Sequence, residues 1–238
     1  NLFDEVSEAF RRMETSLHHA ALLGKRQTVR LALPDVMQHV LQKDFIDAFR
    51  NRYPQYDLEL ITIPNAMYVP HLEILQRTDV ALLLGSGFWE KARVTPLISL
   101  HLTAFCPSTL ARHKFPLQDP RQLEEYPWLN NKEFPESWGW FLSFLGLSGL
   151  YSKVGTDSYE NLAALRNPAL ADAGIALMDI HITPYLLGAR WHRMLDIAVS
   201  SIAYCLVCPE EGGGKPGTDT LIKFFTEQAQ RLGWPAKF

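Results

Sequence analysis

Residues Gln27–Tyr53, QTVRLALPDVMQHVLQKDFIDAFRNRY, predict a strand that turns directly into a long helix. Apolar side chains at alternate positions indicate the strand, because successive residues of a strand face opposite sides of its sheet. Apolar residues then recur at helical spacing: Val36, Val40, Leu41, Phe45, Ile46 and Phe49. Such a helix directs its free N–H groups beyond the sheet, at the edge where open α/β sheets bind small ligands. The turn at Pro34 and Asp35 is therefore a candidate wall of a ligand cleft.

The rest of the chain alternates strands and helices in two series. The first series continues with strands at Asp57–Ile63, Val80–Leu84 and Arg93–Leu100 and a helix over Asn65–Arg77. A second series begins near His101. A last amphipathic helix over Thr218–Leu232 does not fit into this second series. Chains of this kind often form two doubly wound α/β lobes with a ligand between them. We expect residues 25–102 and 206–238 to form one lobe and residues 103–205 the other.

Residues 1–24 predict a separate helix with a heptad repeat. Apolar side chains fall seven residues apart in two rows: Phe3, Phe10 and Leu17, and Val6, Met13 and Ala20. This spacing over three repeats is typical of helices that pair between chains. An amphipathic helix packed on its own domain is the alternative. We expect a dimerising linker helix whose contact is formed by Phe3, Val6, Phe10, Met13 and Leu17.

Composition and charge argue against several classes of protein. The 238 residues are 47% hydrophobic and 21% charged, and a formal net charge of −3 offers no basic surplus for nucleic acid. No apolar run approaches the roughly 18 residues that span a bilayer. The charged N-terminal segment does not resemble a signal peptide. We therefore expect a cytoplasmic protein that does not enter a membrane.

No motif indicates an enzyme, a cofactor or a metal site. The chain has three cysteines, an odd number that favours reduced thiols. Cys205 and Cys208 have the C-x-x-C spacing, but in a predicted strand residues three apart face opposite sides of the sheet. The sequence contains no G-x-S-x-G, Walker or H-E-x-x-H motif. We expect no catalytic residue, no cofactor and no bound metal.

Eight segments occur together in an order and spacing that resemble those of a known family: TVRLALPDVMQHVLQKDFIDAFRNRYPQYDLEL, DVALLLGSGFW, PLISLHLTAFCPSTLA, PLQDPRQLEEYPWL, WGWFLSFLGL, GTDSYENLAAL, ADAGIALMDI and IAYCLVCPE. They are similar to the effector-binding half of LysR-type transcriptional regulators, most closely the glycine-cleavage-activator and beta-lactamase-regulator branch. The resemblance extends over essentially the whole chain.

The resemblance implies a fold, partners and a mode of action. It implies two lobes like those of type 2 periplasmic binding proteins, with a small-molecule effector between them. It also implies a homo-oligomer, dimer or tetramer, whose geometry changes on binding. Promoter DNA would be bound by an N-terminal winged helix-turn-helix of the parent protein, a motif that these residues do not contain. A periplasmic-type solute-binding protein is the alternative. An enzyme that uses the same cleft is supported only by the fact that one fold can host many functions.

Candidate effector-binding residues fall in five segments: Pro34, Asp35 and Val36; Gly85, Ser86 and Gly87; Thr103 and Phe105; Asp157, Ser158 and Tyr159; and Met178 and Asp179. In the family the first of these turns usually carries Ser or Thr, which holds an anionic effector. Here Asp35 either caps the helix or pairs with an amine or hydroxyl of the effector. Its charge would repel a carboxylate. Together with Asp157 and Asp179 it would suit a cationic ligand.

The other segments also have structural alternatives. The glycines of Gly85–Gly87 suit either a tight turn or close approach of a ligand to the backbone. Thr103 is expected where the chain crosses between lobes, with its hydroxyl facing the cleft. Asp157, Ser158 and Tyr159 are expected to open a helix of the second lobe, where Asp157 would be either a cap or a ligand contact.

Overall fold

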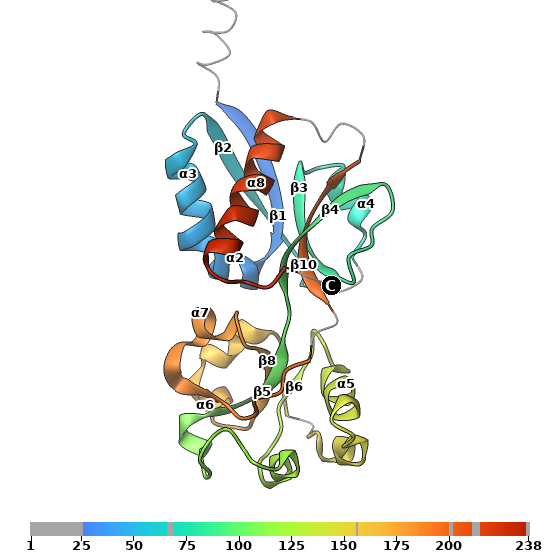
Figure 1. Ribbon diagram of the computed structural model, residues 1–238, viewed down its shortest axis with the longest axis vertical. Coiled ribbons are helices and arrows are strands. Elements are labelled where there is room, and N and C mark those ends of the chain that lie inside the picture. The colour runs from blue at the N-terminus through green and yellow to red at the C-terminus, as the bar shows by residue number, and fades with distance from the viewer. Residues whose placement is uncertain (1–25, 66–68, 156, 200–201, 211–214, 237–238) are drawn as a thin grey trace, which may run out of the picture.

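The computed structural model describes residues 26–65, 69–155, 157–199, 202–210 and 215–236. Within these ranges the chain forms two lobes arranged along the long axis of the molecule (Figure 1). Lobe I contains a five-stranded sheet, and lobe II contains a three-stranded and a two-stranded sheet. Two α/β lobes are therefore present, as the sequence predicts. The expected linker helix, with Phe3, Val6, Phe10, Met13 and Leu17, lies outside the described residues.

The sheet of lobe I has the strand order β2-β1-β3-β10-β4. Its strands are β1 (Gln27–Pro34), β2 (Tyr56–Ile63), β3 (Val80–Gly85), β4 (Ala92–Ser99) and β10 (Ala203–Pro209). β1 is parallel to β2 and β3, whereas β10 is antiparallel to β3 and β4. The chain therefore leaves lobe I after β4 and returns as β10. The return begins at Ala203, within the segment that the sequence assigns to the second lobe.

Helices cover both faces of this sheet. α2 (Asp35–Leu41) follows β1 without an intervening residue, and α8 (Pro216–Arg231) lies beside it on the same face (Figure 1). α4 (His71–Leu75) packs through Leu75 against the opposite face. Among the described residues, the predicted Asn65–Arg77 helix covers only His71–Leu75, with Pro70 as its N-cap.

The helix after β1 contains a π-helical segment. α2 is followed by the π turn Gln42–Asp47 and then by α3 (Ala48–Arg52). The side-chain amide of Gln42 donates to Asp47 Oδ1 at 2.8 Å, across the wider spacing of this turn. The turn places Phe45 and Ile46, which are adjacent in sequence, both in the core.

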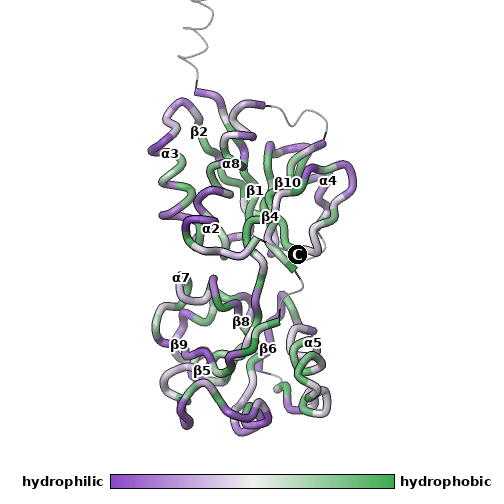
Figure 2. The backbone as a smooth tube through the Cα atoms, viewed as in Figure 1, coloured by the Kyte–Doolittle hydropathy of each residue, from purple (hydrophilic) through white to green (hydrophobic). Residues whose placement is uncertain are grey.

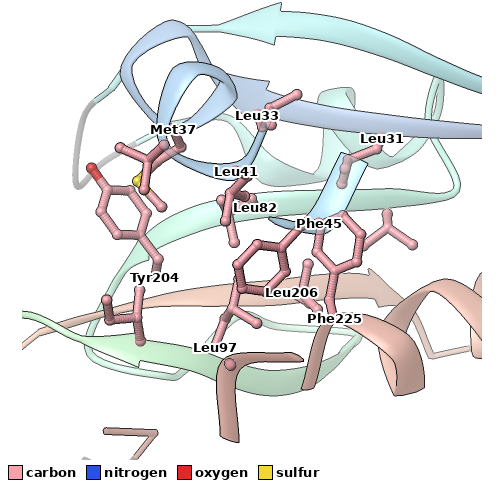
Figure 3. Packing of buried hydrophobic residues seen from close by; sticks show 14 of the residues in the cluster. Leu31, Leu33, Met37, Leu41, Phe45, Leu82, Leu97, Tyr204, Leu206 and Phe225 are labelled. Carbon is pink, nitrogen blue, oxygen red and sulfur yellow. The ribbon is translucent and has the colours of Figure 1, made fainter. Parts of the chain in front are cut away.

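The core of lobe I lies between the sheet and the α2–α3–α8 face. Leu31 and Leu33 of β1 share one core cluster with Met37 and Phe45, and the ring of Phe45 meets that of Phe225 at 5.3 Å between centroids (Figure 3). Figure 2 shows the same contrast along the chain, with hydrophobic strands inside and hydrophilic turns outside. Each of these side chains contributes about 1.5–3 kcal/mol by leaving water. The strand–turn–helix that opens the lobe is therefore held rigidly.

Lobe II is built around β5 (Leu102–Pro107), which lies between β8 (Ala176–Asp179) and β9 (Trp191–Arg193) in an antiparallel sheet. A second, parallel pair is formed by β6 (Asn130–Asn131) and β7 (Ser158–Tyr159). The α-helices are α5 (Ser137–Phe144), α6 (Pro168–Ala171) and α7 (Thr183–Leu187). Short 3₁₀ turns complete the lobe: Ser108–Leu110, Pro120–Glu125, Ser148–Lys153, Leu162–Arg166 and Gly188–Arg190.

Two chain segments cross between the lobes and are hydrogen-bonded to each other. The backbone N–H of Leu100 donates to Ile202 O, and that of Leu102 donates to Val199 O, both at 2.9 Å. Beside this crossing, α2 of lobe I packs against α7 of lobe II. A pair of short, bonded crossings can act as a hinge, because the lobes can move relative to each other while each keeps its own core. No helix in the described part of the chain is long and apolar enough to span a membrane.

Candidate functional site

A cavity of about 70 Å³ lies between the two lobes. Lobe I and the crossing segments line it with Val36, Asn65, Leu84, Leu100, Ile202 and Tyr204. Lobe II lines it with Leu102, Asn131, Glu133, Phe134, Ser137, Trp140, Leu162, Leu177, Met178, Asp179 and Ile182. Because a buried water needs about 10–15 Å³ measured in this way, the space holds only a handful of waters or one small molecule. A larger molecule requires the lobes to separate.

A chain of hydrogen bonds crosses this cavity from lobe I to lobe II. The Tyr204 hydroxyl donates to Asn65 Oδ1 at 2.7 Å, and Asn65 Nδ2 donates to Glu133 Oε2 at 3.0 Å. Tyr204 lies on β10 and Asn65 follows β2, so both belong to lobe I, whereas Glu133 follows β6 in lobe II. The ring of Tyr204 is fixed beside Met37, with its hydroxyl pointing away from the core cluster (Figure 3). The Asn65–Glu133 bond is therefore a latch between the lobes.

Among the described residues, the half-buried carboxylate of Glu133 has no countercharge. Among the described residues its side chain accepts the bond from Asn65 but forms no ion pair with Lys, Arg or His. Burial raises the pKa of Glu133 above its ordinary value of 4.5, and the hydrogen bond from Asn65 opposes this shift. Burial also raises the pKa of Tyr204, with the charge of Glu133 as a further cause. The ionised carboxylate is thus held at an electrostatic cost.

Asp179 lies at the same cavity, but its carboxylate is occupied by the backbone. Oδ1 accepts from the N–H groups of His181 and Ile182, both at 2.8 Å, and Oδ2 accepts from the N–H of His101. These bonds order the turn before α7 and tie it to the crossing segment. Burial raises the pKa of Asp179, and the three N–H donors act in the opposite direction. Few acceptor positions remain for a ligand.

Three of the residues that the sequence singles out line the cavity. Val36 comes from the start of α2, and Met178 and Asp179 come from the end of β8 in the other lobe. The structure therefore brings the expected strand ends together from opposite sides. The strand–turn–helix at Gln27–Tyr53 contributes an apolar side chain to the cavity rather than a polar group.

Pro34 and Asp35 do not line this cavity. Pro34, not Asp35, is the N-cap of α2, and no side chain caps this helix, so the interpretation of Asp35 as a helix cap is wrong. The Asp35 side chain is 63% exposed and lies 3.8 Å from His39 Nδ1. Asp35 is the first residue of the helix, one position after the cap, and the proline at the cap has no side-chain acceptor to offer. The carboxylate of Asp35 faces solvent.

Gly85, Ser86 and Gly87 do not line the cavity, although Leu84, the residue before them in β3, does. Gly85 and Ser86 border a separate open hollow, together with His71 and Trp89. A Cβ atom on Gly85 would lie 2.9 Å from the ring of Trp89, and Gly87 has a positive φ of 91°. The glycines are therefore explained by a packed tryptophan and a left-handed turn.

Thr103 and Phe105 are buried inside lobe II. Thr103 pairs with Met178 in the sheet, and its hydroxyl has no hydrogen-bond partner among the described residues. Phe105 packs with Tyr159 and Met178 in a core cluster. Only Leu102, at the start of the same strand, reaches the cavity.

Asp157, Ser158 and Tyr159 do not open a helix, and that expectation is wrong. Ser158 and Tyr159 form β7, which pairs with Asn130 and Asn131. Asp157 is exposed, and Tyr159 is buried with its hydroxyl 3.5 Å from Leu177 O. Pairing with a strand far away in sequence cannot be read from the local pattern. None of Asp157, Ser158 and Tyr159 lines the cavity.

Sequence reasoning missed the polar centre of the cavity. Asn65, Glu133 and Tyr204 are far apart in the chain, and none belongs to a short motif. One signal was present: Asn65 follows the C-terminal end of β2, at the sheet edge where ligands bind. Within the described residues, no group of His, Cys, Asp and Glu is arranged to hold a metal ion.

The family model and the related sequences that match this chain agree on one family. Residues 23–230 match the family described as LysR substrate binding domain. The HTH-type transcriptional activator AmpR of Rhodobacter capsulatus is 27% identical over 187 residues, which are 77% of this chain and 61% of that protein. The glycine cleavage system transcriptional activator of Escherichia coli K12 is 25% identical over 211 residues, 87% of this chain and 64% of that protein. The chain thus spans less than two thirds of these relatives.

Solved structures show the same fold. The effector domain of AmpR from Pseudomonas aeruginosa superposes with a TM-score of 0.70 at 20% identity, covering 86% of this chain and 96% of that one. The AmpR effector binding domain from Citrobacter freundii gives a TM-score of 0.69 at 17% identity, covering 86% of this chain and 99% of that one. The predicted fold class, two lobes like those of type 2 periplasmic binding proteins, is confirmed.

Proposed function

This chain belongs to the family of LysR substrate binding domains, and from that premise we propose that it senses a small-molecule effector between its lobes. In this proposal the effector changes how the lobes sit relative to each other, and thereby the geometry of a homo-oligomer. The chain itself has no catalytic role, since its relatives are transcriptional regulators.

The observation that carries the proposal is the cavity lined by side chains of both lobes. A ligand there touches lobe I and lobe II at once, so its binding energy differs between the closed and the open arrangement. Such differential binding is what a ligand needs in order to shift a conformational equilibrium. A pocket within one lobe would not have this property.

The parent protein supplies the remaining parts of the proposal. We infer a cytoplasmic regulator that binds promoter DNA through a winged helix-turn-helix outside these residues. Dimers or tetramers would form through the heptad of residues 1–24, with Phe3, Val6, Phe10, Met13 and Leu17 in contact. The small-molecule effector acts on this assembly, and neither a cofactor nor a membrane takes part.

A thermal-shift screen tests effector binding. This chain is heated in the presence of amino acids, aromatic acids, amines and cell-wall fragments, because a ligand that binds the folded state raises the unfolding temperature. Each compound that stabilises the chain is then titrated against Trp140→Ala and Phe144→Ala. Both residues are exposed on α5, Trp140 by 45% and Phe144 by 62%, but of the two only Trp140 lines the cavity.

Loss of the Trp140 ring should weaken binding about tenfold, equivalent to about 1.4 kcal/mol. The Phe144 variant should bind as the wild type does. Equal affinities of the two variants for every stabilising compound would place binding elsewhere and refute the proposed site. Failure of the full-length parent protein to bind promoter DNA would refute its role as a regulator.

A further inference from the structure

We propose that the effector is a small amine whose ammonium group binds Glu133. This inference rests on the proposed function and adds the chemical class of the ligand. Glu133 takes the place of the acidic residues that the sequence suggested for a cationic ligand, because Asp35 and Asp157 do not line the cavity. Glu133, which lines the cavity and still has free acceptor positions, was not among the residues that the sequence suggested.

The charges at the cavity have one sign. Among the described residues that line it, Glu133 and Asp179 are acidic and none is Lys, Arg or His. The carboxylate of Asp179 already accepts hydrogen bonds from three backbone N–H groups. Among the described residues, the carboxylate of Glu133 accepts one hydrogen bond, from Asn65. A carboxylate offers about four acceptor positions. Glu133 therefore retains room for a donor from a ligand.

An ammonium group suits Glu133 for an energetic reason. A carboxylate removed from water is costly unless an opposite charge or several donors compensate it. Asn65 supplies one neutral donor, and no described cation supplies a countercharge. A bound ammonium would provide both the charge and the hydrogen bond. An anionic ligand would meet two carboxylates and no Lys, Arg or His among the described lining residues, which penalises it.

The latch and the amine are compatible. Asn65 occupies Oε2 of Glu133, and its own orientation is fixed because Tyr204 donates to its Oδ1. The amine can therefore bind Glu133 while the Asn65 bond persists. By neutralising the carboxylate, it favours the arrangement in which Glu133 is most buried, which is the closed one. The ligand would thus strengthen closure.

The rest of the ligand should be short and apolar. Most other lining side chains are hydrophobic, including Leu84, Leu177 and Ile182. The space of about 70 Å³ fits a body of only a few heavy atoms. Trp140, whose side chain is partly exposed, lies at this wall and can cover such a body. A short alkyl amine is the simplest molecule with these properties.

The test uses three probes with the same alkyl chain and different charge: n-butylamine, 1-butanol and pentanoate. Binding of each to this chain is measured by isothermal titration calorimetry at pH 7. Wild type is compared with Glu133→Gln, which keeps an acceptor for Asn65 but removes the charge. Glu136→Gln is the matched control, since Glu136 lies in the same segment but is exposed and does not line the cavity.

We expect n-butylamine to bind at least tenfold more tightly than the other two probes. Glu133→Gln should abolish this preference, and Glu136→Gln should leave it intact. Equal or tighter binding of pentanoate, or no loss in Glu133→Gln, overturns the inference. If 1-butanol or pentanoate binds most tightly and Trp140→Ala weakens that binding, the cavity is a ligand site and only the inference of an amine ligand is refuted. If no probe binds, the amine class fails as well, and the library screen alone decides the proposed function.

Discussion

Asn65→Asp is expected to open the lobes. The variant side chain has nearly the same shape and can still accept the Tyr204 hydroxyl, but it presents an oxygen instead of an N–H group to Glu133. The 3.0 Å bond between the lobes is therefore lost, while the bond within lobe I is kept. Because hydrogen bonds to charged groups contribute about 1.5–3 kcal/mol, and this one is only partly buried, we take the lower half of that range. Closure should then become roughly 10- to 40-fold less favourable.

Distances between spin labels measure this opening. Labels at Asp57→Cys in lobe I and Lys153→Cys in lobe II both occupy exposed positions. The three native cysteines are buried, and burial raises the pKa of the Cys106 thiol to about 11, so they should label slowly. Asn51→Asp adds the same charge at an exposed position of lobe I and is the control.

The Asn65→Asp variant should show a longer and broader distance distribution than the wild type and Asn51→Asp. Lowering the pH should reverse part of this change, because protonation of one carboxyl lets it donate to the other. An unchanged distribution in Asn65→Asp at neutral pH would refute the reasoning that this bond holds the lobes together.

Three further predictions concern stability, each measured by urea unfolding. Burial raises the pKa of Glu133 in the folded state, so the ionised carboxylate destabilises the fold. Glu133→Gln should therefore have a higher free energy of unfolding than wild type above about pH 4.5. Below that pH the difference should vanish, because Glu133 is then protonated in both the folded and the unfolded state. A difference that does not depend on pH would contradict this sign. Asp179→Asn should cost about 1–3 kcal/mol, because an amide cannot accept from all three N–H groups, whereas exposed Asp157→Asn should cost less than about 0.5 kcal/mol. Gly217→Ala should cost about 1–3 kcal/mol, because its Cβ would lie 2.6 Å from Val29 Cγ2, and Val29→Ala should relieve part of that cost; strict additivity would argue against the clash.

Much of the fold could be predicted from local patterns. The strand ending at Pro34 and the helix that follows it carry unambiguous apolar spacing, and β3 is an uninterrupted buried run. The π turn at Gln42–Asp47 could not be predicted, because it depends on fitting Phe45 and Ile46 into a core completed by α8. Periodicity alone assigns this segment to a regular helix.

The candidate site was only partly predictable, for a physical reason. Val36 and Met178 were found because they follow or end strands, and strand ends gather at a sheet edge. Glu133 and Tyr204 were missed because their proximity is created by the packing of the lobes, which no local pattern encodes. Asp35 was overvalued because a carboxylate at a helix start is favourable near the helix dipole even when it faces solvent.

The most direct test of the sensing cleft is hydrogen exchange of this chain with and without the compound that stabilises it most. If the compound binds between the lobes, amides of lobe I near Ala203–Cys205 and of lobe II near Asn131–Ser137 and Leu177–Ile182 should become protected together, because one ligand holds both sides. Protection confined to one lobe, or centred on the separate hollow beside His71 and Trp89, would contradict an effector site between the lobes.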